Sequence, residues 1–120
     1  MRTTEVSFEG RLPVDAYGDG GFRVAGTVHR GPLALVPAGV VAWDGLPDLG
    51  PLLERVAEFD VLLVGAGAAI GPMPAAFVAM RSRLEAAGAG VDVMSTPSAA
   101  RTYNVLLAEG RRVAAALMPI

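Results

Sequence analysis

The sequence DVLLVGAG, residues 60–67, decides the fold class of this chain. Residues 61–64 form an unbroken apolar run that ends at Gly65. A run with no polar face is typical of a strand that is buried on both sides in a parallel sheet. Parallel strands need a crossover connection, usually a helix, so we expect a helix and a second strand to follow.

The downstream sequence provides both elements. Residues 74–87 have helical spacing, and Gly88 is well placed to end that helix. One face of the predicted helix carries the apolar side chains of Phe77, Met80 and Leu84. Residues 91–94 are predicted to be the next strand, so the three segments predict a βαβ unit.

A second helix and a final strand are predicted after this unit. The helix spans residues 97–109, with the Thr96 hydroxyl as its N-terminal cap and Pro97 in its first turn. Gly110 is placed to end it. Residues 111–117 are ambiguous between helix and strand, and we predict a strand.

The N-terminal half has the two-residue period of strands. Residues 22–29 alternate and residues 33–36 are apolar, so a turn at 30–32 predicts a hairpin. Further short strands are expected at 11–14 and within 37–43. Together with the βαβ unit, the hairpin predicts an α/β fold with a mixed central sheet.

The period changes to that of a helix at residues 48–59, with Asp48 as the expected N-cap. The apolar positions of this predicted helix are Leu49, Leu52, Leu53 and Val56.

Composition excludes several kinds of chemistry. The chain has 120 residues, of which 52% are hydrophobic, and we expect one domain over residues 1–120. It has no cysteine, and all ten basic residues are arginine, which removes thiolate and lysine chemistry. A net charge of -2 argues against a nucleic-acid partner. No signal peptide is visible, and residues 61–80 are uncharged but broken by glycine and proline, so we expect a cytoplasmic protein without a transmembrane segment.

The glycine-rich segment after the first buried strand is one candidate site. Gly65 and Gly67 lie between a strand and a helix, as in a dinucleotide-binding loop. The third glycine, Gly71, is one position late, and Pro72 and Pro74 remove backbone donors. A tight structural turn is the alternative, and we predict no cofactor.

The segment Arg101-Thr102-Tyr103-Asn104 is the other candidate. Arg101 and Asn104 share a helix face near the ends of the parallel strands, where ligands bind in open α/β sheets. Gly67, Thr96 and Arg101 are therefore expected to border one pocket, although Arg101 and Asn104 could instead form a structural polar network. His29 is the only histidine, so no metal site is predicted.

These motifs also resemble a known family, the Mth-type domain family, which includes mitochondrial respiratory complex I assembly factor 3. The resemblance covers residues 17–120 and is carried by Tyr17-Gly18, Gly21-Phe22, Trp43, residues 60–67, Thr96, Ala100-Arg-Thr-Tyr-Asn104 and Glu109-Gly-Arg111. It implies a three-layer α/β fold whose final strand runs antiparallel to its neighbours.

The resemblance also implies a role without catalysis. The leading hypothesis is a bacterial binding or assembly protein with a protein partner, peripheral to the inner membrane where respiratory complexes are built. The alternative is a small-molecule-binding protein or enzyme that uses the Gly65–Gly71 loop and Arg101. The candidate pocket residues are Gly65, Gly67, Thr96, Arg101, Tyr103 and Asn104. We identify no catalytic residue.

Overall fold

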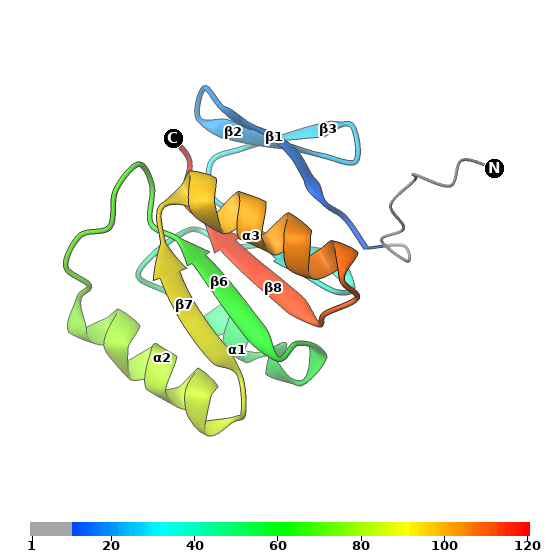
Figure 1. The fold of residues 1–120 in the computed structure, drawn as a ribbon. Coiled ribbons are helices and arrows are strands. Elements are labelled where there is room, and N and C mark those ends of the chain that lie inside the picture. The colour runs from blue at the N-terminus through cyan, green and yellow to red at the C-terminus, as the bar shows by residue number, and fades with distance from the viewer. Residues whose placement is uncertain (1–10) are drawn as a thin grey trace.

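The computed structural model describes residues 11–120, and its helices and strands form three layers (Figure 1). The middle layer is a five-stranded sheet in the order β5-β4-β8-β6-β7. Its strands are β4 (Leu33–Val36), β5 (Gly39–Val41), β6 (Val61–Gly65), β7 (Gly90–Met94) and β8 (Val113–Leu117). The predicted mixed α/β sheet is confirmed.

The final strand, β8, lies in the centre of this sheet. It runs antiparallel to β4 but parallel to β6. The expectation that it runs antiparallel to its neighbours is therefore correct for one neighbour and wrong for the other. The physical reason is the connection through α3 (Thr96–Ala108), which returns the chain to the same end of the sheet before β8 begins.

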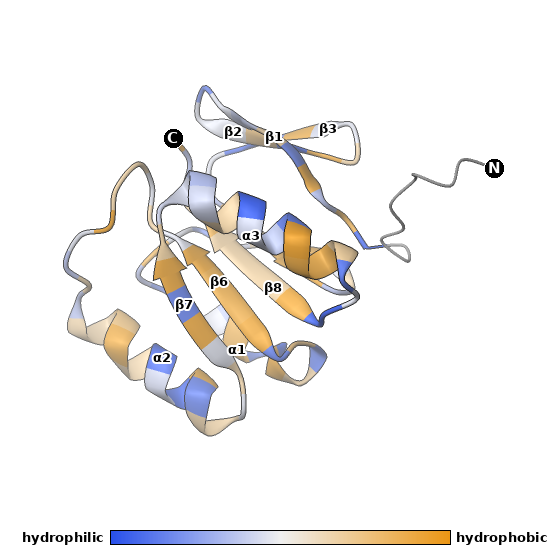
Figure 2. Cartoon of the chain, viewed as in Figure 1, coloured by the Kyte–Doolittle hydropathy of each residue, from blue (hydrophilic) through white to orange (hydrophobic). Residues whose placement is uncertain are grey.

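Helices cover both faces of the sheet. The helix α2 (Ala75–Ala86) joins β6 to the parallel strand β7 and packs with α1 (Gly50–Leu53) on one face. The helix α3 lies on the other face, beside a separate three-stranded sheet. Successive residues of β6 face opposite layers, and both sets are buried, so β6 and β8 are apolar along their length (Figure 2).

The predicted ends of two helices are confirmed. Gly88 and Gly110 have backbone φ angles of 101° and 79°, values that residues with a Cβ rarely adopt. After each glycine the next N–H donates back to the last helical turn, from Ala89 to the Leu84 carbonyl and from Arg111 to the Leu106 carbonyl. Both helices thus end in a Schellman motif.

The predicted hairpin between residues 22–29 and 33–36 is wrong, because these two segments do not pair with each other. The small sheet consists of β1 (Val14–Gly18), β2 (Gly21–Val24) and β3 (Thr27–Arg30), all antiparallel. The expected strand 22–29 is interrupted because Ala25 and Gly26 take φ of 49° and 82°, which turns the chain back on itself. Residues 33–36 instead pair with β5 and β8 in the large sheet.

The predicted helix over residues 48–59 is also shorter than expected. It divides into α1 and a 3₁₀ turn, Val56–Glu58. Asp48 Oδ1 accepts a hydrogen bond from the Gly50 N–H at 2.8 Å, although the helix itself begins only at Gly50. Bonds to the third preceding residue, such as Arg55 N–H to the Leu52 carbonyl, tighten the chain. Phe59, which follows the 3₁₀ turn, is buried in the core.

Candidate functional site

Three segments meet at the carboxyl ends of β6 and β8: the loop after β6, the start of α3 and the residues after β8. The Thr96 side chain, at the start of α3, makes hydrogen bonds to the other two. The Thr96 hydroxyl accepts a hydrogen bond from the Gly67 N–H at 2.9 Å and donates one to the Met118 carbonyl at 2.7 Å. The Thr96 N–H donates to the Gly67 carbonyl at 2.7 Å. This side chain is fully buried, so its role is to hold the loop after β6 against the end of β8.

The expectation that Thr96 caps α3 is wrong. The cap is Ser95, whose hydroxyl accepts a hydrogen bond from the Ser98 N–H at 3.4 Å. Thr96 lies inside the helix, where its hydroxyl is directed to Gly67 and Met118 rather than to a free helical N–H.

Two backbone N–H groups at the start of the glycine-rich loop are already bonded within the fold. The Ala66 N–H donates to the Met94 carbonyl at 2.9 Å, and the Gly67 N–H is bound to Thr96. Pro72 and Pro74 have no N–H. These contacts support the structural-turn interpretation of this segment over a dinucleotide-binding loop.

A groove of about 490 Å³ opens beside this loop. It lies between the loop after β6, the segment before α1 and the residues after β8. Its lining is Leu46, Pro47, Ala66, Gly67, Ala69, Gly71, Pro72, Met73, Pro74, Met118 and Pro119. Every one of these residues is apolar or glycine, so the side chains of the groove offer neither charge nor a nucleophile.

Only Gly67 of the predicted pocket residues lines this groove. Gly65 lies within the sheet, where a Cβ added to it would meet Leu117 and Thr96. Sequence reasoning missed Leu46, Pro47, Met118 and Pro119, because they come from two segments far from the loop along the chain. The only local signal for them is the clustering of proline and methionine at the ends of predicted elements.

Tyr103 and Asn104 hold the N-terminal strand on α3. The Tyr103 hydroxyl donates to the Leu12 carbonyl at 2.8 Å. Asn104 donates to the Val14 carbonyl at 2.8 Å and accepts from the Val14 N–H at 2.9 Å. Its side-chain amide thus makes the two hydrogen bonds that a neighbouring strand would make with Val14. Burial raises the pKa of Tyr103 well above its usual value, against a smaller lowering by the charge of Arg11.

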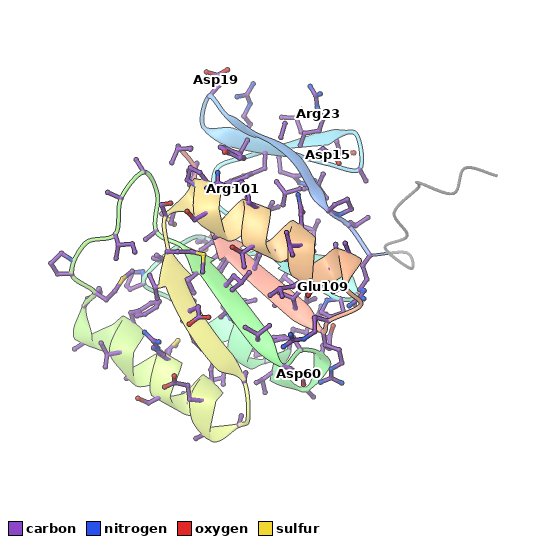
Figure 3. The ribbon with its side chains drawn as sticks, in the orientation of Figure 1. Asp15, Asp19, Arg23, Asp60, Arg101 and Glu109 are labelled. Atoms are coloured by element: carbon purple, nitrogen blue, oxygen red, sulfur yellow. The ribbon has the colours of Figure 1, made fainter. Side chains whose placement is uncertain are left out.

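Arg101 lies on the exposed side of α3 (Figure 3). Its guanidinium donates to the Ser98 hydroxyl, one turn earlier, at 3.5 Å. Arg101 does not line the groove beside Gly67. The structure therefore separates the predicted residues into a buried Gly65–Thr96 contact, a Tyr103–Asn104 contact with the N-terminal strand, and a surface arginine.

We expect Asn104→Ala to lower the free energy of unfolding by about 1–3 kcal/mol, because both backbone groups of Val14 would lose their partner. Urea unfolding followed by circular dichroism measures the change. Arg101→Ala is the control on the same helix, and its stability should stay within about 0.5 kcal/mol of the wild type. Equal stability of both variants would contradict the structural role of Asn104.

Within residues 11–120, no group of three or more His, Asp or Glu side chains is arranged to hold a metal ion. The helices in this part of the chain are also too short or too polar to cross a membrane.

Comparison with known proteins places this architecture in a family. Residues 14–118 match the family model described as protein of unknown function (DUF498/DUF598). An uncharacterized protein of Rhodobacter capsulatus is 48% identical over 120 residues, which cover 100% of this chain and 94% of the relative. Human NADH dehydrogenase [ubiquinone] 1 alpha subcomplex assembly factor 3 is 36% identical over 116 residues, covering 88% of this chain. The match spans only 60% of that relative.

Solved structures agree with this placement. A crystal structure described as an outer membrane protein from Bartonella henselae has a TM-score of 0.81 at 40% identity, covering 94% of this chain and 98% of the other. A solution structure from Bordetella pertussis, described as a Mth938-like domain, has a TM-score of 0.70 at 31% identity, covering 99% and 91%. These matches confirm the Mth-type resemblance, and the chain belongs to the DUF498/DUF598 family.

Proposed function

We propose that this chain is a non-catalytic binding protein that assists the assembly of a respiratory complex by docking an apolar segment of a protein partner. The observation that carries the proposal is the groove between the loop after β6 and the residues after β8. Its lining has no charged, hydroxyl or imidazole side chain, so it can bury apolar surface but has no group for acid–base or nucleophilic chemistry.

The size and composition of the groove suit an apolar segment of a protein. Its volume of about 490 Å³ lies in the range of specific binding pockets. Met73 and Met118 both line it, and methionine side chains adapt to partners of different shape. Met118 is held in place because its sulfur accepts a hydrogen bond from the Leu46 N–H at 3.4 Å.

The relatives support the assembly role. The human and bovine relatives carry the name of an assembly factor for the NADH dehydrogenase 1 alpha subcomplex. This chain spans about 60% of the length of each, so a role at that complex is a proposal for this protein. The small-molecule alternative has weaker support, because Arg101 lies outside the groove and the Gly67 N–H is already bound.

We expect Ala69→Glu to reduce partner binding at least tenfold without unfolding the chain. Ala69 is exposed and lines the groove, so a carboxylate there would have to be desolvated when an apolar segment docks. The measurement is quantitative mass spectrometry of proteins that co-purify with the tagged chain from native lysate. Ala68→Glu adds the same charge in the same loop outside the lining and should retain the partner.

Two results would contradict the proposal. One is a partner that both variants retain equally. The other is the absence of any reproducible partner together with a metabolite that raises the melting temperature of the wild type, which would favour the small-molecule alternative.

A further inference from the structure

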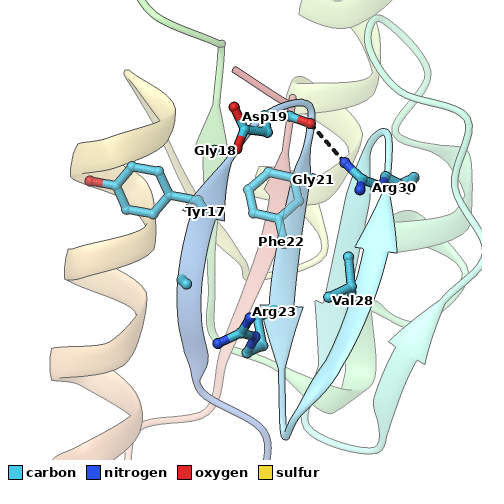
Figure 4. A pocket seen from close by; sticks show the side chains of 9 residues that line it. Tyr17, Gly18, Asp19, Gly21, Phe22, Arg23, Val28 and Arg30 are labelled. Carbon is cyan, nitrogen blue, oxygen red and sulfur yellow. Dashed lines mark hydrogen bonds between the residues drawn. The ribbon is translucent and has the colours of Figure 1, made fainter.

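The outer edge of β3 in the small sheet has no neighbouring strand among residues 11–120. The strand order of this sheet is β1-β2-β3, so β1 and β3 are the edges. The start of β1 is occupied, because Asn104 binds both backbone groups of Val14. No further strand pairs with β3, and Figure 4 shows β3, with Val28 and Arg30, on the side of β2 away from β1. Open edges of this kind accept an added strand from another chain.

The register determines which residues such a strand would meet. The turn at Ala25 and Gly26 makes Val24 and Thr27 the pair next to it. In a two-residue hairpin this pair is hydrogen-bonded, so the backbone groups of Val28 and Arg30 point away from β2. The bond from the Gly31 N–H to the Gly20 carbonyl, at 2.9 Å, fits this alternation. Val28 and Arg30 therefore offer the free donors and acceptors of the edge.

The same two residues project from the outer face of the sheet, together with Arg23. In the register, Arg23 pairs with Val28 and Gly21 with Arg30, so these side chains share one face. The absence of side chains at Gly18 and Gly21 leaves a hollow of about 270 Å³ (Figure 4). Val28 is 52% exposed beside it.

Two arginine side chains, Arg23 and Arg30, line the hollow, and neither forms an ion pair with a carboxylate of the described residues. Arg30 donates to the main-chain carbonyl of Asp19 at 2.9 Å, as the dashed line in Figure 4 shows. Arg23 has no hydrogen bond or ion pair with any residue in the described range. The carboxylates of Asp15, in β1, and of Asp19, which lines the hollow at the turn after β1, form no ion pair with either arginine. Both guanidinium groups can thus bind acidic groups of another molecule.

We propose that an extended acidic segment of a partner protein adds to β3 as a fourth strand. Its backbone would bind Val28 and Arg30 along the open edge, and its acidic side chains would contact Arg30 and Arg23 over the hollow. Directly opposite residues on paired strands are about 5 Å apart at Cβ, so a carboxylate opposite Arg30 is within reach. Alternate residues of an extended segment share a face, so an acidic residue at every second position fits this surface.

This surface shares no residue with the apolar groove, so the inference does not depend on the proposed function. The probe is a synthetic peptide of alternating glutamate and valine, titrated into the isotope-labelled chain and followed by amide NMR shifts. We expect the largest shifts at Val28 and Arg30. The same peptide with glutamine in place of glutamate should bind at least tenfold more weakly, because the arginines would lose their charged partners.

Two variants separate the backbone and charge contributions. Val28→Pro removes the outward N–H but no bond to β2, a position where edge strands tolerate proline, and should abolish binding while the melting temperature is retained. Arg30→Glu should weaken binding at least tenfold. Arg83→Glu makes the same charge change on the exposed surface of α2 and should leave binding unchanged.

The proposal would be overturned by peptide binding that leaves the β3 amides unshifted, or by equal affinity for the glutamate and glutamine peptides. Absence of any shift up to about 1 mM peptide would also overturn it, since a specific contact should be detectable at that concentration. If Val28→Pro is unfolded, the comparison of peptide affinity between the variants Arg30→Glu and Arg83→Glu still decides the outcome.

Discussion

Replacing Gly65 with alanine is expected to lower the free energy of unfolding by about 2–3 kcal/mol, which is at the upper end of the cost of overpacking a core. An added Cβ would lie 2.9 Å from Leu117 Cδ2 and 2.9 Å from both Cα and Oγ1 of Thr96. The Cα belongs to the backbone and cannot move without displacing α3. Urea unfolding followed by tryptophan fluorescence measures the loss.

Gly71→Ala is the matched control for this substitution. It lies in the same glycine-rich loop, but an added Cβ would meet no heavy atom within 4 Å, and no left-handed φ is required there. Its stability should equal that of the wild type or rise slightly, because alanine restricts the unfolded chain. Wild-type stability of Gly65→Ala would show that the close approach of β6 and α3 is not needed.

The sequence predicted those elements whose signals are local. The apolar run at 61–64 became a strand with both faces buried, and Gly88 and Gly110 ended their helices as expected. In each case neighbouring residues decide the structure, through uninterrupted hydrophobicity or the freedom of glycine to adopt positive φ. Family resemblance supplied the three layers, which no local pattern contains.

Long-range pairing could not be predicted in the same way. The run at 33–36 has the composition of any apolar strand, and nothing within it indicates that its partner is β8, some eighty residues later, rather than β3. The sharp turn at Ala25 also lacks a strong signal, because alanine rarely adopts φ of 49°. The predicted hairpin therefore failed where a distant partner was available.

The candidate site shows the same division. The prediction groups Arg101 with Asn104 because residues three apart on a helix share a face, but this spacing does not show which other segment covers each side chain. Tyr103 and Asn104 contact the N-terminal strand, whereas Arg101 is exposed. The groove combines the loop after β6 with residues near 46 and 118, and such a surface exists only once β8 has inserted beside β6. We expect its shape to depend on the contact between Thr96 and the two segments.

That dependence leads to the other large effect. We expect Thr96→Val to lower the free energy of unfolding by about 2–4 kcal/mol, because it keeps the shape of the side chain but removes the hydroxyl. The Gly67 N–H and the Met118 carbonyl would both lose their partner in a fully buried contact. Urea unfolding gives the total loss, and hydrogen exchange at the Gly67 amide reports the contact itself.

Thr96→Ser separates the hydroxyl from the methyl group. It keeps both hydrogen bonds and removes one buried methyl, which costs about 1 kcal/mol. The serine variant should therefore be more stable than the valine variant, and its Gly67 amide should stay protected from exchange. If valine proves the more stable of the two, packing rather than hydrogen bonding holds the loop against β8. The groove would then keep its shape without the hydroxyl of Thr96.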